Sequence, residues 1–352
     1  MNLINQNDLE YQFNQLKGEL NKLKNKKILM TGGLGFLGYN FLNFFNYLNI
    51  KKNYNVKVDV YDVVEKNNLP HWFILYDKNI SYKKCNIIKQ KKFKNADYII
   101  HAASIASPTY YRKYPLETMD ANVIGLRNLL EFYKKKNIKG LLFFSTSEIY
   151  GDPDNKNIPT KETYRGNVSC TGPRACYDES KRYGETLCVN FYKKWKTPIK
   201  IVRPFNNYGP GLNINDKRVI PDFSKNILNK QNIVLFSNGK PSRTFCYISD
   251  AIIGYIKILI KGKAGESYNI GNNKPEISMK ELAILMIKVA NKKYNYRGKL
   301  VIRQSKDKNY LVDNPNRRCP DLSKSKKELN FNPKINLLIG INKTLEWYKK
   351  NQ

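Results

Sequence analysis

Two short segments of this 352-residue chain carry side chains whose types and spacing suit acid–base chemistry. In Y-D-E-S-K, Tyr177 and Lys181 are four residues apart, so a helix would place both on one face. A nearby ammonium group favours phenolate, which lowers the pKa of a tyrosine and makes it a usable base. The second segment, S-T-S-E at 145–148, follows an apolar run and gathers hydroxyl and carboxyl groups at a strand end. Such a cluster also serves simply to end a strand, so other parts of the chain must decide.

A glycine-rich segment near the N-terminus predicts a dinucleotide site. I-L-M-T-G-G-L-G-F-L-G places Gly32, Gly35 and Gly38 between a strand and a helix, where a tight turn, close backbone approach and helix packing exclude side chains. The helix start offers free N–H groups to a pyrophosphate. Asp62 follows 24 residues beyond Gly38, near the spacing of an acid that binds an adenosine ribose, and its charge favours NAD over NADP. The alternative acid, Asp59, points to the opposite side of the same strand.

Short apolar strands alternate with helical stretches from Lys26 to about Arg203. The strands read K-K-I-L-M-T, V-K-V-D-V-Y-D, A-D-Y-I-I-H, G-L-L-F-F-S and I-K-I-V-R. Continuous apolar strands separated by helices are typical of a parallel sheet covered on both faces. We therefore expect an α/β fold, a Rossmann-type doubly wound parallel sheet with a smaller mixed α/β C-terminal substrate lobe. The predicted domains are 26–204 for the NAD-binding domain, with 240–262 returning to it, and 205–239 with 263–352 for the substrate lobe.

Residues 1–25 precede the first strand and are expected to form a helical extension. Its apolar residues recur at spacings of four, three, four and three, namely Leu9, Phe13, Leu16, Leu20 and Leu23. This is the stripe of an amphipathic helix, which must be covered by something apolar. The helix either packs on its own domain or forms a contact with a second subunit.

The composition limits the classes of protein to consider. No apolar run is long enough to span a membrane and no basic-then-apolar leader is visible, which favours a cytoplasmic enzyme without membrane contact. Six scattered cysteines without a C-x-x-C pair, beside only two histidines, predict no metal site and no disulfide framework. The formal net charge of +33 suits a polyanion, but the lysines are spread along the chain without a recognisable nucleic-acid motif. We expect a solvated basic surface and no nucleic-acid partner.

Four longer motifs add to this pattern. They are H-A-A-S-I-A-S-P-T-Y-Y at 101–111, S-T-S-E-I-Y-G-D-P at 145–153, G-P-R-A-C-Y-D-E-S-K at 172–181 and S-R-T-F-C-Y-I-S-D at 242–250. With them the chain resembles the extended short-chain dehydrogenase/reductase family, the NAD-dependent epimerases and dehydratases that modify nucleotide sugars. The resemblance runs from about Lys26 to the C-terminus, and within the family it is strongest to the UDP-glucuronate decarboxylases.

The resemblance implies a catalytic cycle in which NAD+ stays bound. Tyr177 would take the proton of the sugar 4-hydroxyl, Lys181 would hold the phenolate and the nicotinamide ribose, and Thr146 would hydrogen-bond the same oxygen. Oxidation of a glucuronate at C4 gives a β-keto acid, which loses CO2. Ser147 and Glu148 would hold the carboxylate region and manage protonation at C5. Related 4,6-dehydratases carry T-D-E, where the aspartate acts as an acid that serine replaces poorly, although GDP-mannose 4,6-dehydratases resemble T-S-E as well.

Further contacts are implied by the same resemblance. Arg243 matches an arginine beside the sugar carboxylate, and a guanidinium suits bidentate carboxylate recognition. A diphosphate clamp or a surface position is the alternative for this arginine. The other residues expected to bind substrate are Ser107, Tyr111, Arg174, Asn206, Arg218 and Phe236, the last by stacking on uracil. The cofactor site is expected to add Phe36, Leu37, Asn86, Ile87, Ala102, Ala103, Ser104 and Asn122.

Three functions are open on these grounds. The first is NAD-dependent decarboxylation of UDP-glucuronate to UDP-xylose. The second is 4,6-dehydration or C4 epimerisation of a neutral nucleotide hexose by the same Thr, Glu, Tyr and Lys side chains. The third is a non-catalytic NAD- or polyanion-binding module, motivated by the charge alone. Extended relatives usually dimerise through two helices per subunit, and the segment after Pro115 has the required apolar stripe, so we expect a homodimer and leave a tetramer open.

Overall fold

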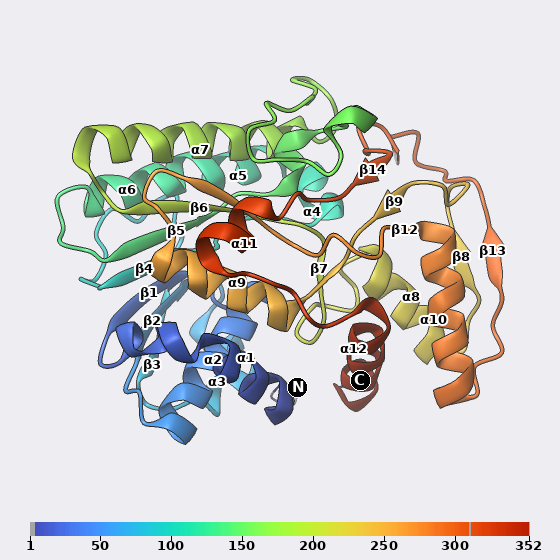
Figure 1. Ribbon diagram of the computed structural model, residues 1–352, viewed down its shortest axis with the longest axis horizontal. Coiled ribbons are helices and arrows are strands. Elements are labelled where there is room, and N and C mark those ends of the chain that lie inside the picture. Colours follow the sequence, from blue (N-terminus) through green and yellow to red (C-terminus); the bar gives the residue numbers. More distant parts are fainter. Residues whose placement is uncertain (1–3, 310, 352) are drawn as a thin grey trace.

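A seven-stranded sheet forms the centre of the protein (Figure 1). The computed structural model describes residues 4–309 and 311–351. The strand order is β11-β6-β5-β4-β1-β2-β3, and every neighbouring pair is parallel. The strands are β1 (Lys27–Thr31), β2 (Lys57–Asp62), β3 (Ile80–Lys84), β4 (Tyr98–His101), β5 (Gly140–Phe144), β6 (Ile199–Pro204) and β11 (Ser267–Ile270). The predicted Rossmann-type fold is confirmed.

The edge strand β11 differs from its predicted place. The sequence pattern predicts residues 263–352 in the substrate lobe, whereas β11 pairs with β6 in the central sheet. Tyr268 and Ile270 of this strand are fully buried. The strand is short, and segments of the second lobe interrupt the strand–helix alternation between β6 and β11, which hides its place from the sequence. The other predicted domain boundaries stay predictions.

Helices cover both faces of the sheet (Figure 1). Strands β4 and β5 are buried along their whole length, as strands between two helical layers must be. One face carries α1 (Gln6–Leu20), α2 (Phe36–Lys52) and α9 (Ile248–Lys261). The other carries α5 (Pro115–Asp120), the π-helix η3 (Ala121–Gly125), α6 (Leu126–Tyr133) and α7 (Ala175–Trp195). Among the described residues, no helix combines the length and apolar character needed to cross a membrane.

A second group of elements packs around a separate apolar cluster, at the right of Figure 1. It comprises α8 (Val219–Leu228), β8 (Ile233–Leu235), α10 (Met279–Tyr294), β13 (Leu300–Ile302) and α12 (Leu337–Asn351). Small sheets and a helix join it to the main sheet, namely β7 (Asn207–Tyr208) with β10 (Cys246–Tyr247), β9 (Ser242–Arg243) between β12 (Ile277–Ser278) and β14 (Arg317–Arg318), and α11 (Ser323–Leu329). The remaining short elements are η1 (Asn21–Leu23), η2 (Lys66–Asn68), α3 (His71–Ile74), α4 (Pro108–Lys113), η4 (Ser147–Tyr150) and η5 (Asn155–Asn157).

The N-terminal helix α1 packs on its own subunit, against α9 and α2. Its apolar stripe is covered there, and Leu16 and Leu20 are fully buried. The buried Asp8 accepts hydrogen bonds from the Tyr247 hydroxyl at 2.6 Å and from Lys343 Nζ at 2.5 Å. Because Lys343 belongs to α12, the extension ties the C-terminal helix to the sheet layer.

Candidate active site

A cavity of about 770 Å³ lies at the carboxyl ends of β1, β4, β5 and β6, where they face the second lobe. Doubly wound folds bind their ligands at this edge of the sheet. Predicted site residues in its wall are Gly32, Gly35, Phe36, Leu37, Ala102, Ser104, Ser107, Tyr111, Thr146, Ser147, Glu148, Arg174, Tyr177, Lys181, Asn206, Arg218, Phe236 and Arg243. The predicted residues that are not part of this wall are Gly38, Asp62, Asn86, Ile87, Ala103 and Asn122.

The glycine turn after β1 has no room for side chains at two of its positions. Gly32 has a φ of +73°, and a Cβ there would lie 2.6 Å from the backbone nitrogen of Ala103. A Cβ on Gly38 would lie 2.2 Å from the carbonyl oxygen of Gly33. Gly35 precedes α2 directly. The turn therefore holds the start of α2 close to the backbone that follows β4.

Asp62 at the end of β2 stands beside this turn. Its carboxylate accepts hydrogen bonds from the backbone N–H of Leu34 at 2.9 Å and of Val63 at 2.7 Å. Burial raises its pKa, and these hydrogen bonds offset part of that effect. Asp59 instead accepts from the Ser81 hydroxyl at 2.7 Å on the opposite side of the strand. The geometry thus favours Asp62 over Asp59 as the ribose acid.

Three other predicted cofactor residues make contacts within the protein. The exposed Asn86 accepts from the backbone N–H of Ile88 at 3.0 Å and so shapes the loop after β3. Ile87 is buried against Gly125 of η3. Asn122 is fully buried and donates to the Ser180 hydroxyl at 2.9 Å. Any role of these residues toward a cofactor stays a prediction.

Tyr177 and Lys181 lie one turn apart on α7, and both are buried. The Tyr177 phenol shares a hydrogen bond with Thr146, the residue just after β5. Burial raises the pKa of Tyr177 despite this bond, and burial lowers the pKa of Lys181 to about 7. From the sequence we expect Lys181 to lower the pKa of Tyr177. The structure differs because Lys181 Nζ donates to the carbonyl oxygen of Phe144 at 2.9 Å and lies 5.7 Å from the Tyr177 ring centre.

Glu148 of η4 is held between two guanidinium groups. Arg174 donates to its Oε2, and Arg318 donates to both oxygens, with an Nη2–Oε2 distance of 2.7 Å. Burial by itself would raise the pKa of this carboxyl. Arg174 and Arg318, with Arg243 nearby, outweigh burial and lower the pKa to about 2. Glu148 is therefore ionised at any pH near neutrality.

Arg243 lines the cavity, but its donors are largely engaged elsewhere. Nη1 donates to the carbonyl oxygen of Ser242 at 2.7 Å, and Nη2 donates to the carbonyl oxygen of Pro315 at 2.6 Å. Arg318 lies directly opposite Arg243 in the β9–β14 pair. Burial and the neighbouring Arg318 lower the pKa of Arg243 to about 9. The pairing of β9 with β14 thus brings two cations to the same end of the cavity.

The remaining predicted substrate residues lie along the cavity. Tyr111 stacks on Tyr177 with ring centres 4.9 Å apart and planes 7° from parallel. Ser107 donates to the carbonyl oxygen of Asp216 at 2.9 Å, and Arg218 forms an ion pair with the Asp216 carboxylate.

Two further predicted residues, Asn206 and Phe236, also lie in the cavity wall. Asn206 donates to the carbonyl oxygen of Thr244 at 2.9 Å, so its side chain links the segment after β6 to the segment after β9. Phe236 is 41% exposed in the cavity wall. An exposed aromatic ring in such a wall suits stacking on a base.

Comparison with known proteins decides the family. The model of the NAD dependent epimerase/dehydratase family matches residues 28–271. The chain belongs to this family. It is 35% identical to UDP-glucuronic acid decarboxylase 6 of Arabidopsis thaliana over 321 residues, which cover 90% of this chain and 87% of the relative. It is 32% identical to UDP-glucuronic acid decarboxylase 1 of Xenopus tropicalis, over 94% of this chain and 74% of the relative.

Solved structures of the NAD-dependent epimerase/dehydratase family share this fold. A dTDP-glucose 4,6-dehydratase from Bacillus anthracis in complex with NAD aligns with a TM-score of 0.74 and 27% identity, over 93% of this chain and 97% of that chain. A UDP-glucuronic acid 4-epimerase from Bacillus cereus in complex with UDP-glucuronic acid and NAD aligns with a TM-score of 0.74 and 24% identity, over 93% of this chain and 100% of that chain.

NAD is the cofactor of this epimerase/dehydratase family, and the residues around the glycine turn fit it. Gly35, where an added Cβ would meet only the Gly32 carbonyl oxygen at 3.4 Å, leaves the start of α2 open to a pyrophosphate. The Asp62 carboxylate beside the turn suits the hydroxyls of an adenosine ribose. Tyr177 and Lys181 lie further along the same cavity, where a nicotinamide ring would face the sugar.

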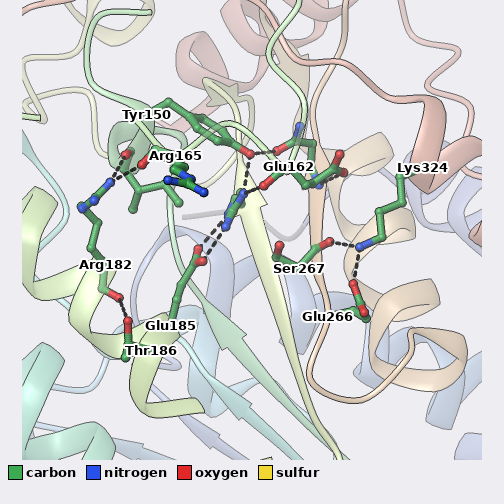
Figure 2. Close-up of polar contacts among 12 residues, drawn as sticks. Tyr150, Glu162, Arg165, Arg182, Glu185, Thr186, Glu266, Ser267 and Lys324 are labelled. Carbon is green, nitrogen blue, oxygen red and sulfur yellow. Dashed lines mark hydrogen bonds and ion pairs between the residues drawn. The ribbon is translucent and has the colours of Figure 1, made fainter. Parts of the chain in front are cut away.

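A polar network joins β6, η4, α7 and β11 (Figure 2). Arg203 of β6 donates to both carboxylate oxygens of Glu185 on α7, at 2.8 and 2.6 Å. It also donates to the Tyr150 hydroxyl of η4 at 2.7 Å, and that hydroxyl donates to Asn269 Oδ1 of β11 at 2.7 Å. The network thereby fixes η4 and α7, which carry Glu148 and the Tyr/Lys pair, to the sheet.

Two charged residues of the site were missed by sequence reasoning. Arg318 follows another arginine in N-P-N-R-R-C-P-D, and nothing local in this lysine-rich chain signals a contact with Glu148, which is 170 residues away. Asp178 is adjacent to Tyr177 in Y-D-E-S-K, and its closeness to that residue was the available signal. It forms an ion pair with Arg174, at 3.6 Å between Nε and Oδ2.

Proposed function

We propose that this protein is an NAD-dependent UDP-glucuronate decarboxylase that forms UDP-xylose. The observation that carries this proposal is the excess of positive charge at the sugar end of the cavity. Arg174, Arg243 and Arg318 converge there around the Glu148 carboxylate. A substrate that brings its own carboxylate to this position balances the excess, and a neutral hexose does not. The names of the curated relatives support the same substrate.

Each of the following residues has a role in the proposed oxidation at C4. Tyr177 accepts the proton of the sugar 4-hydroxyl as the phenolate; burial disfavours this form by raising the pKa, and the Thr146 hydrogen bond favours it. NAD held at the glycine turn would accept the C4 hydride in its oxidised form, NAD+, and return it in its reduced form, NADH. Lys181, held against the sheet by the Phe144 carbonyl, places a positive charge near the phenol and the nicotinamide ribose. The buried stack of Tyr111 on Tyr177 keeps water from the reacting face.

Loss of CO2 follows from the C4 ketone. A carboxylate β to a carbonyl leaves as CO2 when the enolate that remains is stabilised, and the arginines supply cationic donors for the carboxylate before it leaves. Ser147 and Glu148 lie at the same position in the wall and can guide the proton that returns to C5. Glu148 must first give up an arginine, because a carboxyl with a pKa of about 2 takes a proton poorly.

A 4,6-dehydratase or C4 epimerase acting on a neutral hexose is the competing function. It would use the same Thr146, Glu148, Tyr177 and Lys181. In a dehydratase Glu148 would have to remove the C5 proton while two guanidinium groups hold it. Ser147 would also have to protonate the departing hydroxyl, for which its side chain is too weak an acid. The charge of the substrate separates the two functions.

The substrate's nucleotide end belongs to the proposal as well. Arg218 offers a cation for the diphosphate, Asn206 lies beside it in the wall, and Phe236 offers a ring for uracil. A cytoplasmic location is also part of the proposal.

We also propose a homodimer through α5 and α7. Large apolar side chains are exposed on this face, namely Leu116 (71%), Met119 (40%), Ile124 (43%) and Tyr183 (49%). Burying such a patch in a symmetric contact is the common solution in oligomers. We expect Leu116→Glu to convert the dimer to a monomer in light scattering. A wild-type protein that is already monomeric contradicts the proposal.

The deciding experiment incubates the purified chain with NAD+ and, separately, UDP-glucuronate, UDP-glucose, dTDP-glucose and GDP-mannose. CO2 release and product mass are followed together. We expect CO2 and UDP-pentose from UDP-glucuronate alone. Loss of water from a neutral hexose, or a mass-neutral epimer, would show that the arginines serve another purpose.

A further inference from the structure

Asp178 is a buried carboxylate that the mechanism above does not use. It lies in the first turn of α7, next to Tyr177, with 4% of its surface exposed. Its Oδ1 has no hydrogen-bond partner among the described residues. Buried carboxylate oxygens are seldom left in this state, because an unsatisfied charged acceptor is costly.

The group that faces Asp178 is also incompletely satisfied. Arg174 Nε lies 3.6 Å from Asp178 Oδ2, close enough for an ion pair but too far for a hydrogen bond. This Nε is buried and has no hydrogen-bond partner in the described part of the chain. The other side of the same guanidinium donates to Glu148 through Nη2. Arg174 therefore lies between the carboxylates of Glu148 and Asp178 and donates a hydrogen bond to Glu148 but not to Asp178.

The charges at this end of the cavity indicate when Arg174 needs Asp178 as a counter-charge. Three guanidinium groups (Arg174, Arg243 and Arg318) face the Glu148 and Asp178 carboxylates at this end of the cavity, and a further carboxylate near Arg243, Asp152, accepts hydrogen bonds from Asn316. A uronate adds its own carboxylate. If the uronate takes the arginines of the β9–β14 pair, and Glu148 turns to the sugar, Arg174 is left without its partner. A buried guanidinium without a counter-charge is strongly unfavourable.

We propose that Asp178 is a positioning residue that receives Arg174 when Glu148 turns from it toward the substrate. The inference rests on the proposed function. A shortening of the Nε–Oδ2 contact between Arg174 and Asp178 to hydrogen-bond length gives the unpartnered Arg174 Nε an acceptor at the moment when Glu148 is released. Burial and the nearby Glu148 charge raise the pKa of Asp178 to about 7, so removal of the Glu148 charge favours its ionised form and strengthens the new pair.

A purely structural role for Asp178 predicts something different. An acidic residue in the first turn of a helix interacts favourably with the helix dipole, and its loss would lower stability without a particular effect on turnover. The two roles are separated by comparing kcat with KM and with the unfolding temperature. Exchange of an ion pair after binding affects kcat, whereas loss of a helix-terminal charge affects unfolding.

The test compares Asp178→Asn with wild type and with Glu179→Gln, a partly exposed acid on the same helix that pairs with Arg182 at 3.5 Å. CO2 release from UDP-glucuronate is measured over a range of substrate concentrations, and thermal unfolding is measured on the same samples. We expect D178N to lower kcat by at least about tenfold with KM within about threefold and an unchanged unfolding temperature, since it keeps the shape but cannot carry the charge. E179Q should match wild type in all three. Unchanged kcat in D178N overturns the proposal, and so does a fall in kcat that follows the unfolding temperature.

A double variant sharpens the test. In Glu148→Gln no carboxylate leaves Arg174, so D178N should add little to the loss of kcat that E148Q causes by itself. Additive effects overturn the exchange. If D178N does not fold, Asp178→Ser is measured in the same way. Wild type that releases no CO2 from UDP-glucuronate defeats the proposed function, whereas active wild type with an equally active D178N defeats only the role of Asp178.

Discussion

The two ends of the cavity are built in different ways. The cofactor end consists of one contiguous turn at 32–38 and the carboxylate of Asp62, and most of its contacts come from the backbone. The sugar end is assembled from η4, the first turn of α7 and the paired strands β9 and β14, which are far apart in the sequence. Charged side chains dominate it.

From this difference we expect the cofactor end to control cofactor binding and the sugar end to control the reaction step. A turn that accepts a ligand by the absence of side chains binds its cofactor much the same way before and during reaction. A cluster of arginines and carboxylates can redistribute its charges as the substrate changes from a carboxylate to CO2, and such rearrangement affects the reaction step. Substitutions at the two ends should therefore change different kinetic constants.

Tyr177→Phe removes the group at the junction of the two ends and should have the largest effect. Loss of the acid–base phenol should lower kcat by roughly 10²–10⁴-fold with little change in NAD affinity. CO2 release and cofactor binding are measured on the same protein. Tyr183→Phe, an exposed tyrosine on the same helix, serves as the control. A fully active Y177F would favour a non-catalytic role for the fold.

Arg318→Gln tests the sugar end. It removes the two-pronged contact with Glu148, and we expect kcat/KM for UDP-glucuronate to fall by about 10–100-fold, the size of a lost charge-assisted pair. Arg317→Gln changes the neighbouring arginine, which pairs with Glu276 at 2.8 Å instead, and should stay within about threefold of wild type. Equal losses in the two variants would mean that general charge, and not the contact with Glu148, matters.

Predictability from sequence follows the same division. The glycine turn, Asp62 and the Tyr177–Lys181 pair were visible because their chemistry depends on residues close together in the sequence. The resemblance to nucleotide-sugar enzymes, which the family match confirmed, supplied the reaction class.

The long-range pairing of the sugar end was not visible. Arg318 reaches Glu148 only because β14 pairs with β9, and strands of two residues leave no periodic signal. The expectation that Arg243 holds the sugar carboxylate stays a prediction, and nothing in the sequence indicates that much of this guanidinium is also bound to backbone carbonyls. Burial also reversed the expected pKa direction of Tyr177, since a spacing of four residues shows proximity but not desolvation.

Asp62→Ala tests the cofactor end, with a smaller expected effect. The loss of one carboxylate beside the ribose should weaken NAD binding by about tenfold, or ~1.4 kcal/mol, and reduce the preference over NADP. Fluorescence titration with NADH and NADPH measures both. Asp59→Ala, on the opposite side of the same strand, should bind NADH as wild type does. A larger loss in D59A would exchange the roles of the two acids.

The pH dependence of the free energy of unfolding distinguishes the buried charge of Lys181 from that of Glu148. Burial holds the pKa of Lys181 at about 7 in the folded protein, below its unfolded value of 10.5, so the unfolded chain binds more protons between these values. The free energy of unfolding should therefore rise as pH rises from about 7 toward 10. Glu148 affects stability at acid pH. Its pKa is lowered from 4.5 to about 2, so its contribution to the free energy of unfolding is lost as pH falls below about 4.5.

Lys181→Met should reduce the alkaline rise, to which Lys200 also contributes because burial lowers its pKa to about 8, and should leave the acid limb unchanged, while Glu148→Gln should reduce the acid limb. We expect changes of a few degrees in unfolding temperature, measured from pH 3 to 10. Lys193→Met, an exposed lysine on the same helix, should change neither limb. If K181M kept the full alkaline rise, the buried Lys181 ammonium would not be its source, and burying this charge would not lower the stability of the protein.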